Sequence, residues 1–213
     1  MAEKDHNTLT EEEKNQGWKL LFDGQSTEQW RGFRKDHFPE GWQVVDGTIH
    51  RVDKAGDIIT KEQFGDFELQ LDWKVAGPGN SGIFFHVSED EDAVWKTGPE
   101  MQILNDDVHP DGKNPLTRVG SNYALHAPKV DACKPVGQWN HVRIVVKGPH
   151  VELWLNGQQT VEYELGSEDW EKRVAESKFS KFPNYGRLDS GHIALQDHSD
   201  PVWFRNIKIL PLD

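Results

Sequence analysis

The chain has 213 residues and a formal net charge of -12, from 36 acidic and 24 basic residues. Its length fits one β-sandwich, or at most two small domains, and suffices to bury a sizeable core. The acidic balance disfavours nucleic acids and anionic membrane surfaces as partners, because both are polyanions, and no apolar run approaches the roughly 20 residues that cross a bilayer.

Neither the start of the chain nor its single cysteine determines the cellular compartment of the protein. The first six residues, Met-Ala-Glu-Lys-Asp-His, are too polar for a signal peptide, although a chain that began after a removed signal would look the same. A periplasmic or secreted location therefore stays open beside a cytoplasmic one. Cys133 excludes an intrachain disulfide, and no nearby histidine suggests a catalytic pair, so we expect this cysteine to be structural or incidental.

Residues 1–16 are expected to form a polar arm, either as a short helix that includes Glu11-Glu12-Glu13 or as a loose segment. From Gly17 onward, short stretches of alternating apolar and polar residues are separated by Gly, Pro, Asn and Asp, which is typical of all-β proteins. The candidate strands are 18–22, 42–45, 48–52, 67–75, 82–87, 100–104, 141–147, 150–155, 158–164, 192–196 and 202–209. No repeat, linker or low-complexity tract interrupts them, which predicts a single domain over residues 17–213.

The best-marked hairpin spans residues 141–157. Val142, Ile144 and Val146 alternate with polar residues, Gly148-Pro149 supplies one turn, and Asn156-Gly157 supplies the next. Consecutive hairpins favour an antiparallel arrangement, and about eleven strands imply two sheets. We therefore predict an all-β, two-sheet antiparallel jelly-roll sandwich.

One helix is predicted as an insertion between strands, from Ser167 to about Phe179. Ser167 can cap its start, and the acidic residues that follow suit the positive end of the helix dipole. Trp170 and Val174 form the apolar stripe by which such a helix packs on a core.

Strand periodicity assigns side chains to faces, because residues i and i+2 of a strand point to the same side. In residues 100–104, Met101 and Ile103 would enter the core between the sheets. Glu100 and Gln102 would then lie side by side on the opposite face.

Two further strands direct polar side chains to that same face. Residues 82–87 place His86 opposite Ile83 and Val87, so this imidazole could lie near the Glu100 carboxylate if the two strands pair. Residues 191–198 place Gln196 and His198 away from the core. Three strands thus offer polar, titratable groups to one surface.

The alternative is that these faces are ordinary solvated outer faces of a sandwich. They carry Gln, His and Glu beside the Gly-rich turn 79–82, whereas an exposed face more often carries Lys, Thr and Ser. They also lie at strand ends, where loops can wall off a cleft. A partly shielded Glu beside a His makes a reasonable acid and base pair, because burial and mutual interaction shift both pKa values toward neutrality.

Other motif classes receive no support. The sequence has no Gly-rich phosphate loop, HExxH, CxxC or Gly-x-Ser-x-Gly. Asn105, Asp106, Asp107, His109 and Asp111 resemble an oxygen-rich cation site, although Asn and Asp clusters more often mark turns. A divalent cation is therefore the one cofactor that the sequence suggests.

Seven motifs follow one another along the chain: Leu21-Phe22-Asp23-Gly24 with Trp30, Gly79-Asn80-Ser81-Gly82-Ile83, Pro99-Glu100-Met101-Gln102-Ile103-Leu104, Gly137-Gln138-Trp139-Asn140, Trp154-Leu155-Asn156-Gly157, Ser177-Lys178-Phe179, and Gly191-His192-Ile193-Ala194-Leu195-Gln196-Asp197-His198 through Phe204-Arg205-Asn206-Ile207. In this order they resemble the 3-keto-disaccharide hydrolase family, long classed as a domain of unknown function. The resemblance covers residues 17–210. It implies a concanavalin-like jelly roll, in agreement with the fold predicted from periodicity.

The resemblance also implies an activity, the hydrolysis of glycosides that a partner oxidoreductase has already oxidised at C3 of the sugar. A C3 ketone acidifies the C2 proton, so a base can remove that proton, the C1 substituent can leave by elimination, and water can add afterwards. This route differs from the two-carboxylate displacement of ordinary glycosidases. The expected partner is thus a 3-keto-sugar substrate, with neither nucleic acid nor a membrane involved.

By position, Glu100 with Gln102 matches the acidic motif of the family, and His198 with Asp197 matches its Gln-Asp-His motif. The resemblance therefore implies Glu100 or His198 as the base. His86 is the third catalytic candidate, although it stands where many members of the family carry Arg.

The expected sugar contacts are Gln102, Gln196, Asp197, Arg205 and Tyr123. For Arg205, simple alternation predicts a position beside Ile207, toward the core, in a buried ion pair unless a bulge intervenes. Turn and packing roles are expected for Asn80, Trp139, Asn140, Asn156 and Gly157.

Two other classes of function remain open. Lectins use the same sandwich without catalysis, so a non-catalytic carbohydrate-binding module is the main alternative. A structural or interaction role would draw on the acidic surface, but it leaves the grouped His and Gln side chains unexplained.

Overall fold

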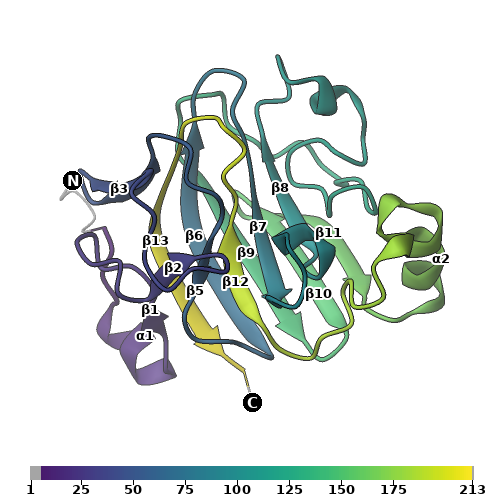
Figure 1. Cartoon of the computed structure of the whole chain (residues 1–213), viewed down its shortest axis with the longest axis horizontal. Coiled ribbons are helices and arrows are strands. Elements are labelled where there is room, and N and C mark those ends of the chain that lie inside the picture. Colours follow the sequence, from purple (N-terminus) through teal and green to yellow (C-terminus); the bar gives the residue numbers. More distant parts are fainter. Residues whose placement is uncertain (1–5, 213) are drawn as a thin grey trace.

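The computed structural model describes residues 6–212, and within them two antiparallel sheets pack face to face (Figure 1). The larger sheet has the order β11 (Gln158–Glu164), β10 (His150–Leu155), β9 (Asn140–Lys147), β6 (Phe67–Val75), β13 (Val202–Pro211), β4 (Thr48–Arg51) and β3 (Trp42–Val45), with β1 (Lys19–Leu20) paired to β13. The smaller sheet has the order β2 (Trp30–Gly32), β5 (Ile58–Thr60), β12 (His192–Leu195), β7 (Asn80–Val87) and β8 (Glu100–Leu104). The prediction of an all-β, two-sheet jelly-roll sandwich is confirmed.

The core lies between the sheets and follows the predicted alternation. Along β6 every second residue, from Phe67 to Val75, is buried, and Met101 and Ile103 of β8 face it from the smaller sheet. Burying such side chains stabilises a fold by roughly 1.5–3 kcal/mol each. The strands that the sequence did not predict are β2 and β5, each of which has three residues and is too short to show a period.

Two α-helices flank the described part of the sandwich. Residues 1–5 of the predicted arm lie outside the described residues, and the rest of it contains α1 (Glu11–Gln16), which begins with a capping box between Thr10 and Glu13. The inserted helix is α2 (Glu168–Glu176), capped by Ser167 as predicted. It ends earlier than predicted, because Ser177 adopts an extended backbone and caps a separate short helix, η3 (Lys178–Lys181). No helix within residues 6–212 is long and apolar enough to span a membrane.

The outer face of the smaller sheet is covered, and this cover creates the site. Every residue of β7, β8 and β12 is buried. Val94 of η1 (Val94–Lys96) packs with Phe84 and Ala194 in a second, smaller apolar cluster on that face. Residues 120–123 run along the free edge of β8, where the Tyr123 N–H donates to the Glu100 carbonyl. The interpretation of this face as an ordinary solvated surface is therefore wrong.

Candidate active site

A cleft of about 150 Å³ opens on the covered outer face of the smaller sheet. Five of the eight predicted site residues line it: Glu100, Gln102, Tyr123, Gln196 and His198. Four other residues also line the cleft: Asn80, Trp95, Asp111 and Lys178. The sequence predicted a turn role for Asn80 and a candidate cation site at Asp111, and no role for Trp95 or Lys178. The alternation of side chains along the strands thus correctly predicted that Glu100, Gln102 and Gln196 lie on one face.

Glu100 occupies space that a glycine leaves free. In the pairing of β7 with β8, Gly82 lies opposite Gln102, and Phe84 lies opposite Glu100. A Cβ atom on Gly82 would fall 2.9 Å from Cδ of Glu100, which is closer than real carbon atoms approach each other. Gly82, the last residue of the predicted turn 79–82 and the first of the predicted strand 82–87, lies within β7, where it makes room for the carboxyl group.

The Glu100 carboxyl group is buried without a hydrogen bond from any described residue, and the residue is 6% exposed. Burial raises its pKa to about 8, since removal from water disfavours the charged form. Lys178 acts in the opposite direction, while the carboxylates of Asp57 and Asp111 raise the pKa further. A carboxyl group with a pKa this close to neutrality can both accept and return a proton.

Lys178 supplies the positive charge of the cleft. Its ammonium nitrogen lies 4.5 Å from the ring centroid of Tyr123, 5.0 Å from that of Trp95 and 5.2 Å from that of Phe179. Strand periodicity did not predict this role, because Lys178 stands on η3. Its part in one of the family motifs was the only indication.

Two amide oxygens in the cleft have no partner within the described residues. The Gln102 side chain donates from Nε2 to the carbonyl of Thr117 at 3.0 Å, but its Oε1 accepts nothing. The buried Oε1 of Gln196 is likewise unpaired. Because a buried acceptor without a hydrogen bond costs about 1–3 kcal/mol, these atoms favour a ligand that brings hydroxyl groups.

The lining of the cleft also includes a phenol, a carboxylate and an imidazole, which belong to Tyr123, Asp111 and His198. The Tyr123 hydroxyl donates to Asp111 at 3.4 Å, and burial, with Asp111 and Glu100 nearby, raises the pKa of that hydroxyl to about 12. His198 is exposed, has no hydrogen bond to a described residue, and lies with its ring 6.3 Å from that of His109. Asn80, which was expected only to shape a turn, contacts the other side of His109 at 3.2 Å.

The predicted cation site uses its oxygens for other purposes. Asp106 accepts from Arg118 and from the backbone N–H of Val119, both at 2.9 Å, and Oδ1 of Asn105 accepts from the backbone N–H of Asp107 at 3.3 Å. Across residues 6–212 no group of three or more His, Cys, Asp or Glu side chains is arranged to hold a metal ion.

His86 lies outside the cleft, because β7 contains a bulge. The register between β7 and β12 shifts here, and His86 adopts a φ of 51°. Val87 therefore packs on the outer face, while the His86 ring contacts Phe67 edge-on and its Nε2 lies 2.9 Å from the carbonyl of Gly65. The prediction that His86 approaches Glu100 is wrong, since one extra residue reverses every later side chain.

Asp197 is fully engaged by the protein. Its Oδ1 accepts from Arg51 at 2.7 Å and from the Ser199 N–H at 3.0 Å, and its Oδ2 accepts from the N–H groups of Ala55 and Gly56. Burial alone would raise the pKa of Asp197, but these donors hold it below its ordinary value. The structure thus assigns Asp197 to fixing the end of β12, and its predicted contact with sugar is not supported by this geometry.

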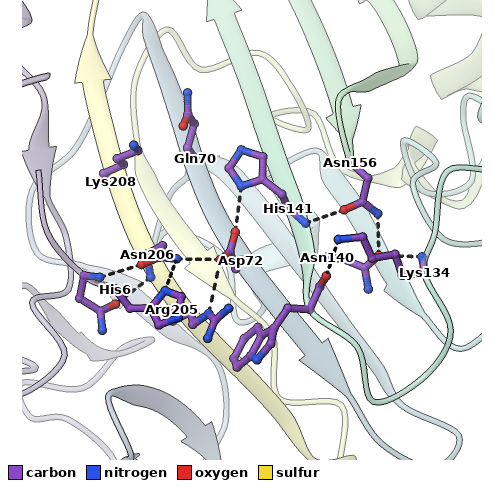
Figure 2. A network of polar contacts seen from close by, with 12 residues as sticks. His6, Gln70, Asp72, Lys134, Asn140, His141, Asn156, Arg205, Asn206 and Lys208 are labelled. Carbon is purple, nitrogen blue, oxygen red and sulfur yellow. Dashed lines mark hydrogen bonds and ion pairs between the residues drawn. The ribbon is translucent and has the colours of Figure 1, made fainter. Parts of the chain in front are cut away.

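Arg205 lies on β13, next to Asp72 and Asn206 (Figure 2). β13 belongs to the larger sheet, whereas the cleft lies on the outer face of the smaller one. A bulge at Asn206, which has a φ of 54°, separates Arg205 from the buried Ile207 and turns it outward. Its guanidinium contacts Asp72 at 3.4 Å and covers the Trp139 ring at 4.0 Å. The prediction of Arg205 as a sugar contact in this cleft is therefore wrong. The bulge that the sequence left open keeps Arg205 out of the core, and the predicted ion pair forms with Asp72 outside it.

Residues 17–210 match the family model described as the 3-keto-alpha-glucoside-1,2-lyase-like domain. The chain belongs to this family. A protein named 3-keto-disaccharide hydrolase from Bacteroides thetaiotaomicron is 34% identical over 229 residues, covering 92% of this chain and 79% of that protein. The resemblance inferred from the seven motifs is confirmed.

Solved structures agree with the family assignment. A Parabacteroides distasonis protein described as a candidate glycosyl hydrolase superposes with a TM-score of 0.91 at 38% identity, covering 98% of this chain and 100% of that chain. A second such protein from the same species has a TM-score of 0.73 at 30% identity, covering 92% of this chain and 99% of that chain. The jelly-roll sandwich is thus shared with these structures across nearly the whole 3-keto-alpha-glucoside-1,2-lyase-like domain.

Proposed function

We propose that this chain, a glycosyl hydrolase by family, cleaves 3-keto-glycosides by abstraction of the C2 proton, elimination of the C1 substituent and hydration. The observation that carries the proposal is Glu100, a buried carboxyl group with a raised pKa and no hydrogen bond from residues 6–212, in a cleft lined by amides and aromatic rings. The name of the Bacteroides thetaiotaomicron relative supports the substrate class, and a 1,2-lyase in the family description supports elimination across C1 and C2.

The first step needs a base beside C2 and a positive charge beside the C3 oxygen. A ketone at C3 acidifies the C2 proton, and the ionised Glu100 carboxylate removes it. Negative charge then develops toward the C3 oxygen, where Lys178 provides an opposing charge in the same cleft. Stabilisation of such developing charge is commonly the largest single contribution to catalysis.

The leaving group departs toward the open side of the cleft. His198 lies there, exposed and without a hydrogen bond to a described residue, so one ring nitrogen can give a proton to the departing oxygen. Water then adds at C1, and the proton held by Glu100 returns to C2. The net reaction consumes one water molecule and no cofactor.

Binding of the sugar is assigned to the polar floor and the aromatic wall. Gln102 and Gln196 present unpaired carbonyl oxygens that can accept from sugar hydroxyl groups. Trp95 and Tyr123 offer ring surfaces against which the apolar face of a pyranose can pack. Because the substrate is already a ketone, a sugar oxidoreductase must act before this enzyme.

Release of the leaving group from a 3-keto-glucoside and from the matching unoxidised glucoside tests the proposal. We expect cleavage of the keto sugar alone, incorporation of deuterium at C2 in D₂O, and a loss of roughly 10²–10⁴-fold in Glu100→Gln. Glu40→Gln, at an exposed position without a hydrogen bond or ion pair to a described residue, is the matched control.

Equal turnover by Glu100→Gln would remove this residue from the chemistry. Calorimetric binding of unmodified oligosaccharides, without consumption of any keto sugar, would instead favour the non-catalytic carbohydrate-binding module.

A further inference from the structure

We propose that Lys178 acts covalently: its amine condenses with the C3 ketone of the substrate, and Glu100 removes the C2 proton from the resulting iminium ion. This inference rests on the proposed function, because it requires a ketone in the cleft. In this mechanism the positive charge lies on a nitrogen that is bonded to C3. In the non-covalent alternative it would lie on an ammonium group near the C3 oxygen.

Lys178 is held by ring faces and not by hydrogen-bond acceptors. Its nitrogen lies within 5.2 Å of three ring centroids, and it makes no hydrogen bond or ion pair with any residue from 6 to 212. Lys96 provides the contrast, because it lies 5.2 Å from the ring of Phe182 but also pairs with Asp92 and Glu91. Of these two ring-packed amines, Lys178 is thus the one that can lose its proton without breaking an ion pair.

The surroundings of Lys178 favour a reactive amine. Although the residue as a whole is exposed, partial loss of hydration at its ammonium group lowers the pKa of Lys178, and Glu100 and Asp111 act in the opposite direction. Contact with the aromatic rings likewise favours the protonated form of Lys178, because an aromatic ring binds a cation more strongly than a neutral amine. Glu100 itself is largely protonated at neutral pH, which limits the negative charge that would hold the ammonium form. A partly desolvated lysine among aromatic side chains is a known way to prepare a nucleophile for carbonyl carbon.

The bonds balance at each step. The neutral amine of Lys178 adds to C3, and the former carbonyl oxygen leaves as water, which yields a protonated imine. Glu100 takes the C2 proton, and the electron pair forms the C2–C3 double bond and neutralises the nitrogen. The resulting enamine expels the C1 oxygen substituent, which takes up a proton. One water then adds at C1 while the proton returns to C2, and a second water hydrolyses the imine, so one water is consumed in total.

Reductive trapping tests this step. Protein incubated with a 3-keto-glucoside and sodium borohydride should gain the mass of one reduced sugar adduct, and peptide mapping should place it on Lys178. Lys181→Arg, an exposed neighbour at the end of η3 that does not line the cleft, should trap normally. Lys178→Arg keeps the charge but cannot form an imine, and it should lose turnover as fully as Lys178→Met, by roughly 10²-fold or more.

Two results would overturn the covalent role. One is turnover of the keto sugar by the wild type with no adduct on Lys178, and the other is near-normal activity in Lys178→Arg. Glu100→Gln separates this inference from the proposed function, because it should still be trapped on Lys178 while turnover is lost. Failure of the proposed function would appear differently, as no consumption of 3-keto-glucosides by the wild type.

Discussion

Replacement of Glu100 by glutamine should stabilise the protein while it inactivates the enzyme. Burial raises the pKa of Glu100 from an ordinary value of 4.5 to about 8. Between these values the unfolded chain releases the proton and the folded chain keeps it, so stability is greatest below pH 4.5 and falls as the pH rises toward 8. The free energy of unfolding falls by about 1.4 kcal/mol per pH unit in this range, so it is about 3 kcal/mol lower at pH 7 than below pH 4.5.

Thermal unfolding followed from pH 5 to pH 8 measures this effect. Glutamine stays neutral, so the Tm of Glu100→Gln should exceed that of the wild type by a small amount at pH 5 and by roughly 6–12 °C at pH 7. Glu40→Gln, at an exposed position, should show no such divergence. The same ionisation should control catalysis, with kcat/KM of the wild type rising about tenfold per pH unit below pH 8 and levelling above it.

The outcome that refutes this account is a Tm difference that stays constant with pH. It would mean that the buried carboxyl group ionises as easily in the folded chain as in the unfolded one, and that Glu100 lacks the properties assigned to it here.

Three further predictions follow from the structure. Gly82→Ala should displace the Glu100 carboxyl group and lower kcat, and Glu100→Asp, which shortens the side chain, should couple with it in a double-mutant cycle; purely additive effects would contradict the steric explanation. Asp197→Asn should lower the free energy of unfolding by about 3 kcal/mol, because it leaves the Arg51 charge uncompensated, while KM of the folded enzyme stays unchanged; a raised KM with normal stability would restore Asp197 as a sugar contact. Burial raises the pKa of the Cys133 thiol to about 12, so iodoacetamide at pH 8 should modify it far more slowly than free cysteine; rapid labelling would argue against that burial.

Strand prediction succeeded for every strand of four or more residues, to within two residues at each end. The strands β3, β6, β8, β10 and β11 match the predicted ranges residue for residue. The alternation of side chains then correctly placed Glu100 and Gln102 on one face, because β8 pairs with β7 without a bulge. The sequence alone was therefore sufficient for the central pair of the site.

The prediction of side-chain direction from strand alternation failed at β-bulges. His86 and Asn206 both have positive φ and both sit at register shifts, which reversed the predicted directions of His86 and Arg205. A bulge adds one residue to a strand without changing its apolar and polar composition, so a pattern of period two does not reveal it.

The sequence by itself determined the class of fold, the family, and the presence of an acid beside an amide on one strand, because these depend on local periodicity and on ordered motifs. Only the tertiary structure decided that Lys178, Asp111 and Trp95 join Glu100, since they arrive on loops and short helices whose path is set by packing against the sheet. It also decided the chemistry of Glu100 itself. The pKa of a carboxyl group depends on how much water the rest of the chain removes from it, and that cover is assembled from several separate segments, which include η1, residues 120–123 and η3.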